Sequence, residues 1–109
     1  MRKIKTFDVF KLARIIRLSG AKEDIAESLR ATQSGEAPGE VGINLMMTLI
    51  TVCGNEEVEK SIYELIGGIA EEKPDDIMNK DLDKLTELLR NIAEENNITD
   101  FFETAVKSA

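Results

Sequence analysis

The chain has 109 residues, about the size of one ordinary domain and too short for two cores, so we expect a single domain over residues 1–109. It has no histidine and one cysteine, Cys53, which excludes a Ser/His or Cys/His catalytic pair and a zinc site built from His or several Cys ligands. The net charge is −7, and this acidic balance argues against nucleic-acid binding.

The first predicted helix runs from Thr6 to about Ser19. Thr6 belongs to a residue type that caps helix N-termini, and Gly20 stands where helices commonly end in a left-handed residue. Its apolar residues fall on two sides of a helical wheel, so the helix has no purely polar face. One side is the arc that should pack into the core: Val9, Leu12, Ala13 and Ile16.

The other side of this helix mixes apolar and basic side chains. We interpret it either as a surface that meets a neighbouring helix, a second copy or a client protein, or as an ordinary helix surface whose Lys and Arg stems extend into water. Both interpretations stay open at this point. The residues on this side are Phe7, Phe10, Lys11, Arg14, Arg17 and Leu18.

A second helix is predicted from Lys22 to about Ser34, with acidic residues near the positive end of its dipole and Ile25 on its buried side. The stretch Gly35–Gly39 that follows contains Pro38 and is predicted to be a loop.

The segment "INLMMTLITVC", residues 43–53, is the most apolar part of the chain. As a helix it would be about 16 Å long, roughly half of the hydrocarbon core of a bilayer, so it is not a membrane span. Its polar residues Asn44, Thr48 and Thr51 recur with helical spacing rather than alternating. We therefore predict a central apolar helix over residues 42–53, with Gly39 and Gly42 before it and Gly54 after it.

Helical spacing continues to the end of the chain. Asn55 should cap a fourth helix, Pro74 should open a short helical turn, and a long helix should begin near Asp81. The last helix should begin near Thr99. The predicted fold is all-α, a compact bundle of about five to six helices around the central helix. The fourth helix should bury one face: Val58, Ile62, Leu65, Ile66 and Ile69.

No catalytic or ligand-binding motif emerges from the sequence. The acidic residues between Asp75 and Glu87 do not fit a calcium loop, because Met78 and Lys80 occupy ligand positions and Asp81 the required glycine. Gly67 and Gly68 lie inside a helical pattern and lack the rest of a phosphate-binding loop. We therefore expect no enzyme activity, no metal and no cofactor.

Charge is distributed unevenly along the chain. Residues 1–22 hold seven Lys or Arg and only Asp8 as an acid, a charge of +6, whereas the other 87 residues hold seven basic and twenty acidic residues, a charge of −13. This asymmetry is consistent with an anionic partner, with head-to-tail self-association, or with neutralisation inside one folded chain.

Two stretches carry a resemblance to a known family. They are "KIKTFDVFKLARIIRLSGAKEDI" at residues 3–25 and "DLDKLTELLRNIAEENNITDFFETAV" at residues 81–106, on either side of the Gly/Pro loop and the apolar helix. Together they resemble the tail assembly chaperones of long-tailed bacteriophages and prophages. The resemblance implies an all-helical, non-enzymatic protein of the bacterial host cytoplasm that binds the tape measure protein, keeps it soluble, and assists assembly of the tail tube protein around it.

The family provides no residue-level motif, so the candidate surfaces come from the helical wheel alone. The first is the mixed side of the first helix, from Phe7 to Leu18, and the second is Phe101 with Phe102 in the last helix. The alternative is a small acidic interaction protein that acts as a regulator or as a decoy for a basic nucleic-acid-binding partner. An unrecognised enzyme is the third class considered.

Overall fold

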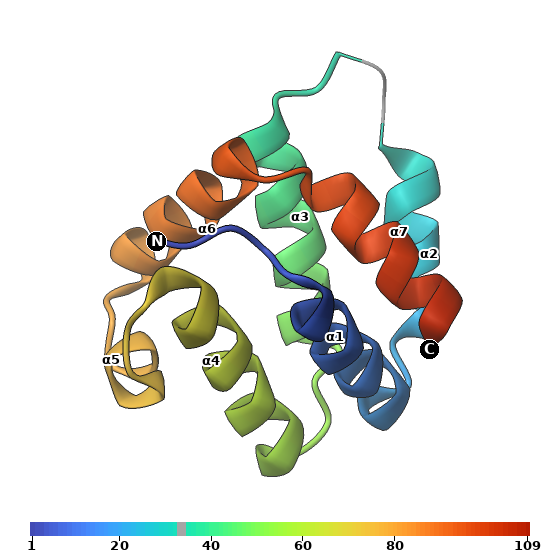
Figure 1. Cartoon of the computed structure of the whole chain (residues 1–109). Helices are drawn as coiled ribbons and strands as arrows, with labels where there is room; N and C mark the ends of the chain where they lie inside the picture. Colours follow the sequence, from blue (N-terminus) through green and yellow to red (C-terminus); the bar gives the residue numbers. More distant parts are fainter. Residues whose placement is uncertain (33–34) are drawn as a thin grey trace.

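The computed structural model describes residues 1–32 and 35–109, and these residues form seven helices and no strand. The all-α prediction is confirmed, with more helices than the five to six expected. Figure 1 shows the helices packed around one another, with α3 inside the assembly. The helices are α1 (Thr6–Ser19), α2 (Lys22–Ala31), α3 (Pro38–Thr51), α4 (Glu56–Ala70), α5 (Pro74–Met78), α6 (Leu82–Glu95) and α7 (Ile98–Ser108).

Helix α1 has the predicted bounds but a different N-cap. Lys5, not Thr6, occupies the cap position: its N–H donates to Asp8 Oδ2 at 2.8 Å, and the Asp8 N–H donates to the Lys5 carbonyl at 3.0 Å. The prediction of Thr6 as the cap is wrong because Asp8, at the third helical position, satisfies the backbone of the first turn. Gly20 ends the helix in the predicted left-handed conformation, with a φ of 70°.

Helix α3 begins four residues earlier than predicted. Pro38 occupies its first turn, where the fixed φ of proline suits a helix and its missing N–H is not needed. The predicted loop is therefore wrong over its last two residues, and the predicted helix end at Cys53 is wrong by two residues because α3 ends at Thr51. In the part of the chain that the structure describes, no helix is long and apolar enough to cross a bilayer.

Two glycines expected to precede α3 lie inside it instead. Gly42 is buried where α3 packs against α6, the pair of helices with the most extensive contact. A Cβ atom added at Gly42 would lie 2.3 Å from the Cβ of Ala93. Glycine therefore serves here to let two helices approach closely, and this contact offsets the cost of about 1 kcal/mol for glycine within a helix.

Gly42→Ala is expected to destabilise the protein by about 1–3 kcal/mol, because overpacking against the immobile Ala93 outweighs the gain in helix propensity. Gly68→Ala is the matched control, since its Cβ would meet only the end of the Arg2 side chain, at 3.3 Å. That variant should be neutral or gain up to about 1 kcal/mol. Urea denaturation of both variants measures the difference, and equal stability of the two would contradict this account of Gly42.

Most of the other boundaries agree with the sequence pattern, and the end of α2 does not. The Asn55 side chain accepts the Val58 N–H at 2.9 Å, which confirms the predicted cap of α4. The predicted face of α4 is buried as a whole. Helix α2 ends at Ala31, because Thr32 is its C-cap and has an extended backbone; the predicted end near Ser34 is therefore too late, and residues 33–34 lie outside the described part of the chain. The Leu, Ile and Phe side chains that are at most 2% exposed come from six helices: Leu12, Ile15, Ile16, Ile25, Leu45, Leu49, Leu65, Ile77 and Phe102.

The five residues before α1 run across the C-terminal ends of α4 and α6 (Figure 1). The Arg2 N–H donates to the Ile69 carbonyl at 2.9 Å, and the Lys3 ammonium donates to the Glu95 carbonyl at 2.7 Å. The Ile4 N–H donates to Asn96 Oδ1 at 3.0 Å. These contacts join the start of α1 to two helices that lie far from it in the sequence.

Candidate protein-interaction surface

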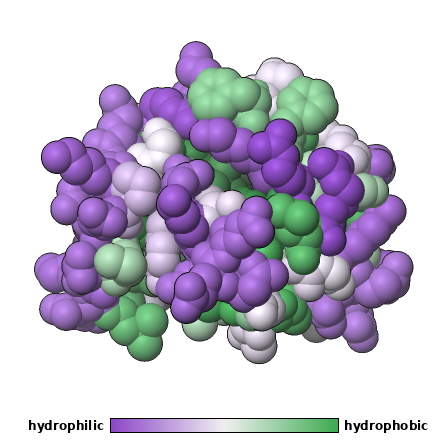
Figure 2. All heavy atoms as spheres, turned by 90° about the horizontal axis from the view of Figure 1, so that it is seen from below, coloured by the Kyte–Doolittle hydropathy of each residue, from purple (hydrophilic) through white to green (hydrophobic). Residues whose placement is uncertain are grey.

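The predicted mixed side of α1 is exposed, and we call it the α1 outer face. Phe7 is 47% exposed, Phe10 62% and Leu18 51%, in a chain whose other apolar residues are mostly buried. Lys11, Arg14 and Arg17 are exposed beside them. Figure 2, which views the molecule from below Figure 1, shows apolar side chains reaching the surface in separate groups divided by hydrophilic ones. The α1 outer face consists of Phe7, Phe10, Lys11, Arg14, Arg17 and Leu18.

The opposite side of α1 is buried as predicted. Leu12 and Ile16 have no exposed surface, Ala13 has almost none, and Val9 is half-buried. This side packs against α4 and α7. The α1 outer face is therefore built on a helix that is fixed in the core along its whole length, so a partner would meet a preformed surface.

Phe7 is held in place by two cations. The guanidinium carbon of Arg2 lies 4.8 Å from the centre of the Phe7 ring, and the Lys11 ammonium lies 5.6 Å from it. Cation–π contacts at exposed sites contribute about 0.5–1 kcal/mol each, enough to restrict the ring without burying it. An aromatic side chain that is both restricted and exposed loses little conformational entropy when a partner covers it.

Most cations of the basic N-terminal part lack a carboxylate partner. Of the basic side chains in residues 1–22, only Arg2 forms an ion pair with a carboxylate among the described residues. Arg17 donates to the Ser108 carbonyl at 3.1 Å instead. Lys11 and Arg14 form no ion pair in the described parts of the chain. Neutralisation inside the folded chain, one of the three interpretations of the charge asymmetry, therefore accounts for Arg2 but not for the α1 outer face.

The Arg2–Asp8 pair was not predicted from the sequence. Asp8 is 1% exposed, and both of its oxygens accept from the Arg2 guanidinium, at 2.6 and 2.8 Å. Burial by itself would raise the pKa of Asp8, but the hydrogen bonds from Arg2 and the Lys5 N–H, with the charges of Arg2 and Lys11, outweigh it and lower that pKa. The sequence signal for this pair is that Asp8 is the single acidic residue in residues 1–22, which hold seven basic residues.

The second candidate surface of the sequence analysis is not a surface. Phe102 has no exposed area and Phe101 is 6% exposed, and their rings pack edge to face with centres 5.7 Å apart. Helix α7 contacts α1, α2, α3 and α6, so both rings lie inside the molecule. We therefore do not retain Phe101 and Phe102 as partner-binding residues.

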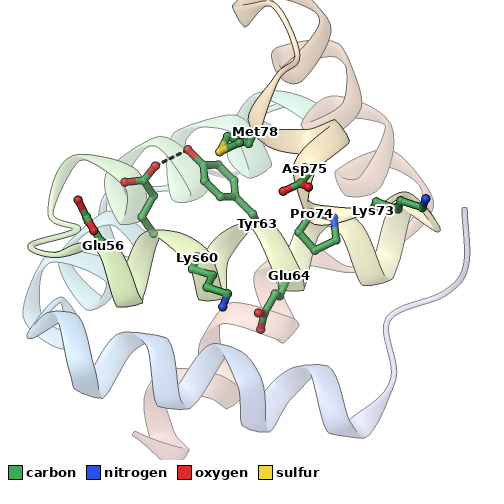
Figure 3. A pocket seen from close by; sticks show the side chains of 9 residues that line it. Glu56, Lys60, Tyr63, Glu64, Lys73, Pro74, Asp75 and Met78 are labelled. Carbon is green, nitrogen blue, oxygen red and sulfur yellow. Dashed lines mark hydrogen bonds between the residues drawn. The ribbon is translucent and has the colours of Figure 1, made fainter.

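An open groove of about 680 Å³ lies between α4 and α5. Figure 3 shows Tyr63 and Glu64 projecting from α4, and Pro74 and Asp75 from α5. The Tyr63 hydroxyl donates to Glu59 at 2.7 Å, and this hydrogen bond raises the pKa of Tyr63 because it favours the protonated phenol. Sequence reasoning did not predict this groove. It carries carboxylates and ammonium groups side by side and does not converge on one ligand chemistry.

Among residues 1–32 and 35–109, no three His, Cys, Asp or Glu side chains converge as ligands for a metal ion. Comparisons with known protein families, with curated proteins and with solved structures find no match for this chain. The α1 outer face is the feature of the described residues that has the clearest chemistry for binding a partner.

Proposed function

We propose that this protein is a non-enzymatic tail assembly chaperone of a long-tailed bacteriophage or prophage, acting in the cytoplasm of the bacterial host. In this role it binds the tape measure protein, keeps it soluble, and assists assembly of the tail tube protein around it. The pattern of residues 3–25 and 81–106 supports the family, and the α1 outer face supports binding of another protein. The observation that carries the proposal is that Phe7, Phe10 and Leu18 are exposed on a helix otherwise fixed in the core.

The chemistry of this surface suits a temporary complex. A soluble chaperone must cover apolar stripes of its client and remain soluble after release, which requires apolar contacts with polar edges. Each of the three apolar side chains is about half exposed, so burying the remainder gains on the order of 1 kcal/mol each before the cost of association. Several copies along a long client would then bind tightly in sum while each contact stays reversible.

Co-expression with the tape measure protein tests the proposal. The wild-type chain is expected to raise the soluble fraction of that protein. If each side chain contributes about 0.5 kcal/mol to binding, the Phe7→Ala/Phe10→Ala/Leu18→Ala variant should bind the client about tenfold more weakly and keep correspondingly less of it soluble. The matched control is Met47→Ala/Met78→Ala/Leu82→Ala, which removes three exposed apolar side chains from other helices. Loss of rescue in the control alone, or no rescue by the wild-type chain, would contradict the proposal.

The acidic body of the chain favours one alternative function. Residues 23–109 carry a charge of −13, which suits a regulator or decoy that occupies a basic, nucleic-acid-binding partner. Such binding should weaken steeply between about 50 and 500 mM salt, whereas rescue by apolar contacts should change little. Rescue of the tape measure protein that survives high salt would favour the chaperone.

A further inference from the structure

The six residues of the α1 outer face follow a definite order along the helix. Phe7 and Phe10 lie at the N-terminal end, the three cations occupy the middle, and Leu18 lies at the C-terminal end. Together they span about 16 Å along the axis and an arc of about 120°, which is the size of the contact between two packed helices over three turns. The backbone of α1 is hydrogen-bonded within the helix, so it offers no edge to a β-strand, and a helix is the element that fits.

The cations in the middle of the α1 outer face determine which charge a partner helix should carry. Of the seven basic side chains in residues 23–109, two form an ion pair with a carboxylate among the described residues: Arg90 lies 3.5 Å from Glu40, and Lys80 lies 2.9 Å from Glu72. Arg14 and Lys11 have no such partner in the described residues. A wholly apolar partner would cover these cations without pairing them, and an uncompensated charge is costly to remove from water. A partner with carboxylates over the middle of the face avoids that cost.

We infer that the α1 outer face binds an amphipathic helix of the client that has apolar residues at both ends and Asp or Glu opposite Lys11, Arg14 and Arg17. The inference rests on the proposed function, because it names the chemistry of the client segment at the same surface. A segment of about three turns matches the length of the face. Arg14 lies at the centre of the arc, between Phe7 and Phe10 on the helical wheel, so its carboxylate partner would be the most enclosed.

Two other occupants fit the face less well. A second copy placed symmetrically would bring its own three cations against Lys11, Arg14 and Arg17, and this repulsion disfavours a two-fold dimer through the face. An anionic membrane would attract the cations and accept Phe7 and Phe10, but it would repel residues 23–109, whose charge is −13. A helix with acidic residues opposite these cations satisfies both the apolar and the charged side chains.

Two synthetic helices test the inference. Both carry the same apolar residues, and one has Glu and the other Lys at the positions opposite the cations. The full-length chain is titrated into each labelled peptide and the fluorescence anisotropy is measured. At about 50 mM salt we expect the Glu peptide to bind at least about tenfold more tightly, and we expect this ratio to shrink at about 500 mM salt.

Charge reversal provides the matched comparison. Arg14→Glu/Arg17→Glu should invert the preference, so that the Lys peptide binds more tightly. Lys60→Glu/Lys84→Glu makes the same change in net charge at exposed positions of α4 and α6 and should keep the preference for the Glu peptide. Circular dichroism of both variants verifies that the helices are retained.

Three results would overturn the inference: equal binding of the two peptides, loss of preference in the Lys60→Glu/Lys84→Glu control, or binding of the wild-type chain to vesicles of anionic phospholipid with no binding to either peptide.

The co-expression assay distinguishes failure of the acidic-helix inference from failure of the proposed chaperone function. If Arg14→Glu/Arg17→Glu still rescues the tape measure protein while the Phe7, Phe10 and Leu18 alanine variant does not, the chaperone stands and the acidic helix is wrong. If the peptides behave as expected but no variant alters rescue, the acidic helix stands and the chaperone function of this face is wrong.

Discussion

Phe102→Ala is expected to lower the free energy of unfolding by about 3–5 kcal/mol, the largest effect we expect of any single substitution in this protein. The Phe102 side chain has no exposed surface and lies where α7 meets its neighbouring helices. Truncation removes its transfer free energy and leaves a cavity that the surrounding helices can close only in part.

Phe10→Ala is the matched control, because the same atoms are removed from a side chain that is 62% exposed. Its expected cost is below about 1 kcal/mol. Urea denaturation followed by circular dichroism at 222 nm measures both variants. If Phe102→Ala unfolded at the same urea concentration as Phe10→Ala, the assignment of Phe102 to the core would have to be abandoned.

Asp8→Asn is expected to destabilise the protein by about 2–3 kcal/mol at neutral pH. The substitution weakens two charge-assisted hydrogen bonds from Arg2 and the bond from the Lys5 N–H that starts α1. Since Asp8 is 1% exposed, water cannot readily replace these partners. Arg2 also lies against the Phe7 ring, so the α1 outer face should become more mobile at its N-terminal end.

The sign of the pH dependence follows from the lowered pKa of Asp8. Between the folded-state pKa and the unfolded value of about 3.9, the unfolded chain binds a proton that the folded chain does not, so stability falls as the pH falls. The contribution of Asp8 is complete above the unfolded value and is lost as the pH passes down through the folded value. The gap in stability between wild type and Asp8→Asn should therefore narrow in acid.

Urea denaturation at about pH 7 and in steps below about pH 4 measures this gap. Glu103→Gln, which removes the charge of an exposed carboxylate in α7, is the control and should differ little from wild type at any of these pH values. A gap between wild type and Asp8→Asn that stayed constant down to the lowest pH would mean that the Asp8 charge does not stabilise the fold.

The helices themselves follow from sequence periodicity, and most of their ends follow from local chemistry. The cap at Asn55 and the left-handed end at Gly20 depend on a few neighbouring residues only, which is why both predictions hold. The predicted positions of Gly39 and Gly42 before the helix are wrong because a glycine near a helix start has two physical uses. The sequence alone does not distinguish a glycine that ends a helix from a glycine that lets a helix approach a second helix closely, as Gly42 does with Ala93 in α6.

The burial of α7 depended on information that no local pattern contains. Phe101 and Phe102 are consecutive and point about 100° apart, so on a helix covered from one side we would expect only one of them to be buried. Contacts of α7 with α1, α2, α3 and α6 cover both. The exposure of Phe7 and Phe10 could be predicted, because the strongest apolar arc of α1 lies on the opposite side of the helix. The lack of carboxylates beside Lys11 and Arg14 became visible only once the helices were placed.

The packing of α1 against α7 also constrains how the chain can fold during synthesis. Lys3, just before α1, donates to the Glu95 carbonyl, and Arg17 in α1 donates to the Ser108 carbonyl, so these contacts join residues 92 and 91 positions apart in a chain of 109. While a ribosome is still translating the middle of the message, α1 has no α7 on which to bury Leu12 and Ile16. The core should therefore close only after the last helix has left the exit tunnel, and such long-range closure is slow compared with helix formation. Until then the nascent chain exposes an apolar helix of its own.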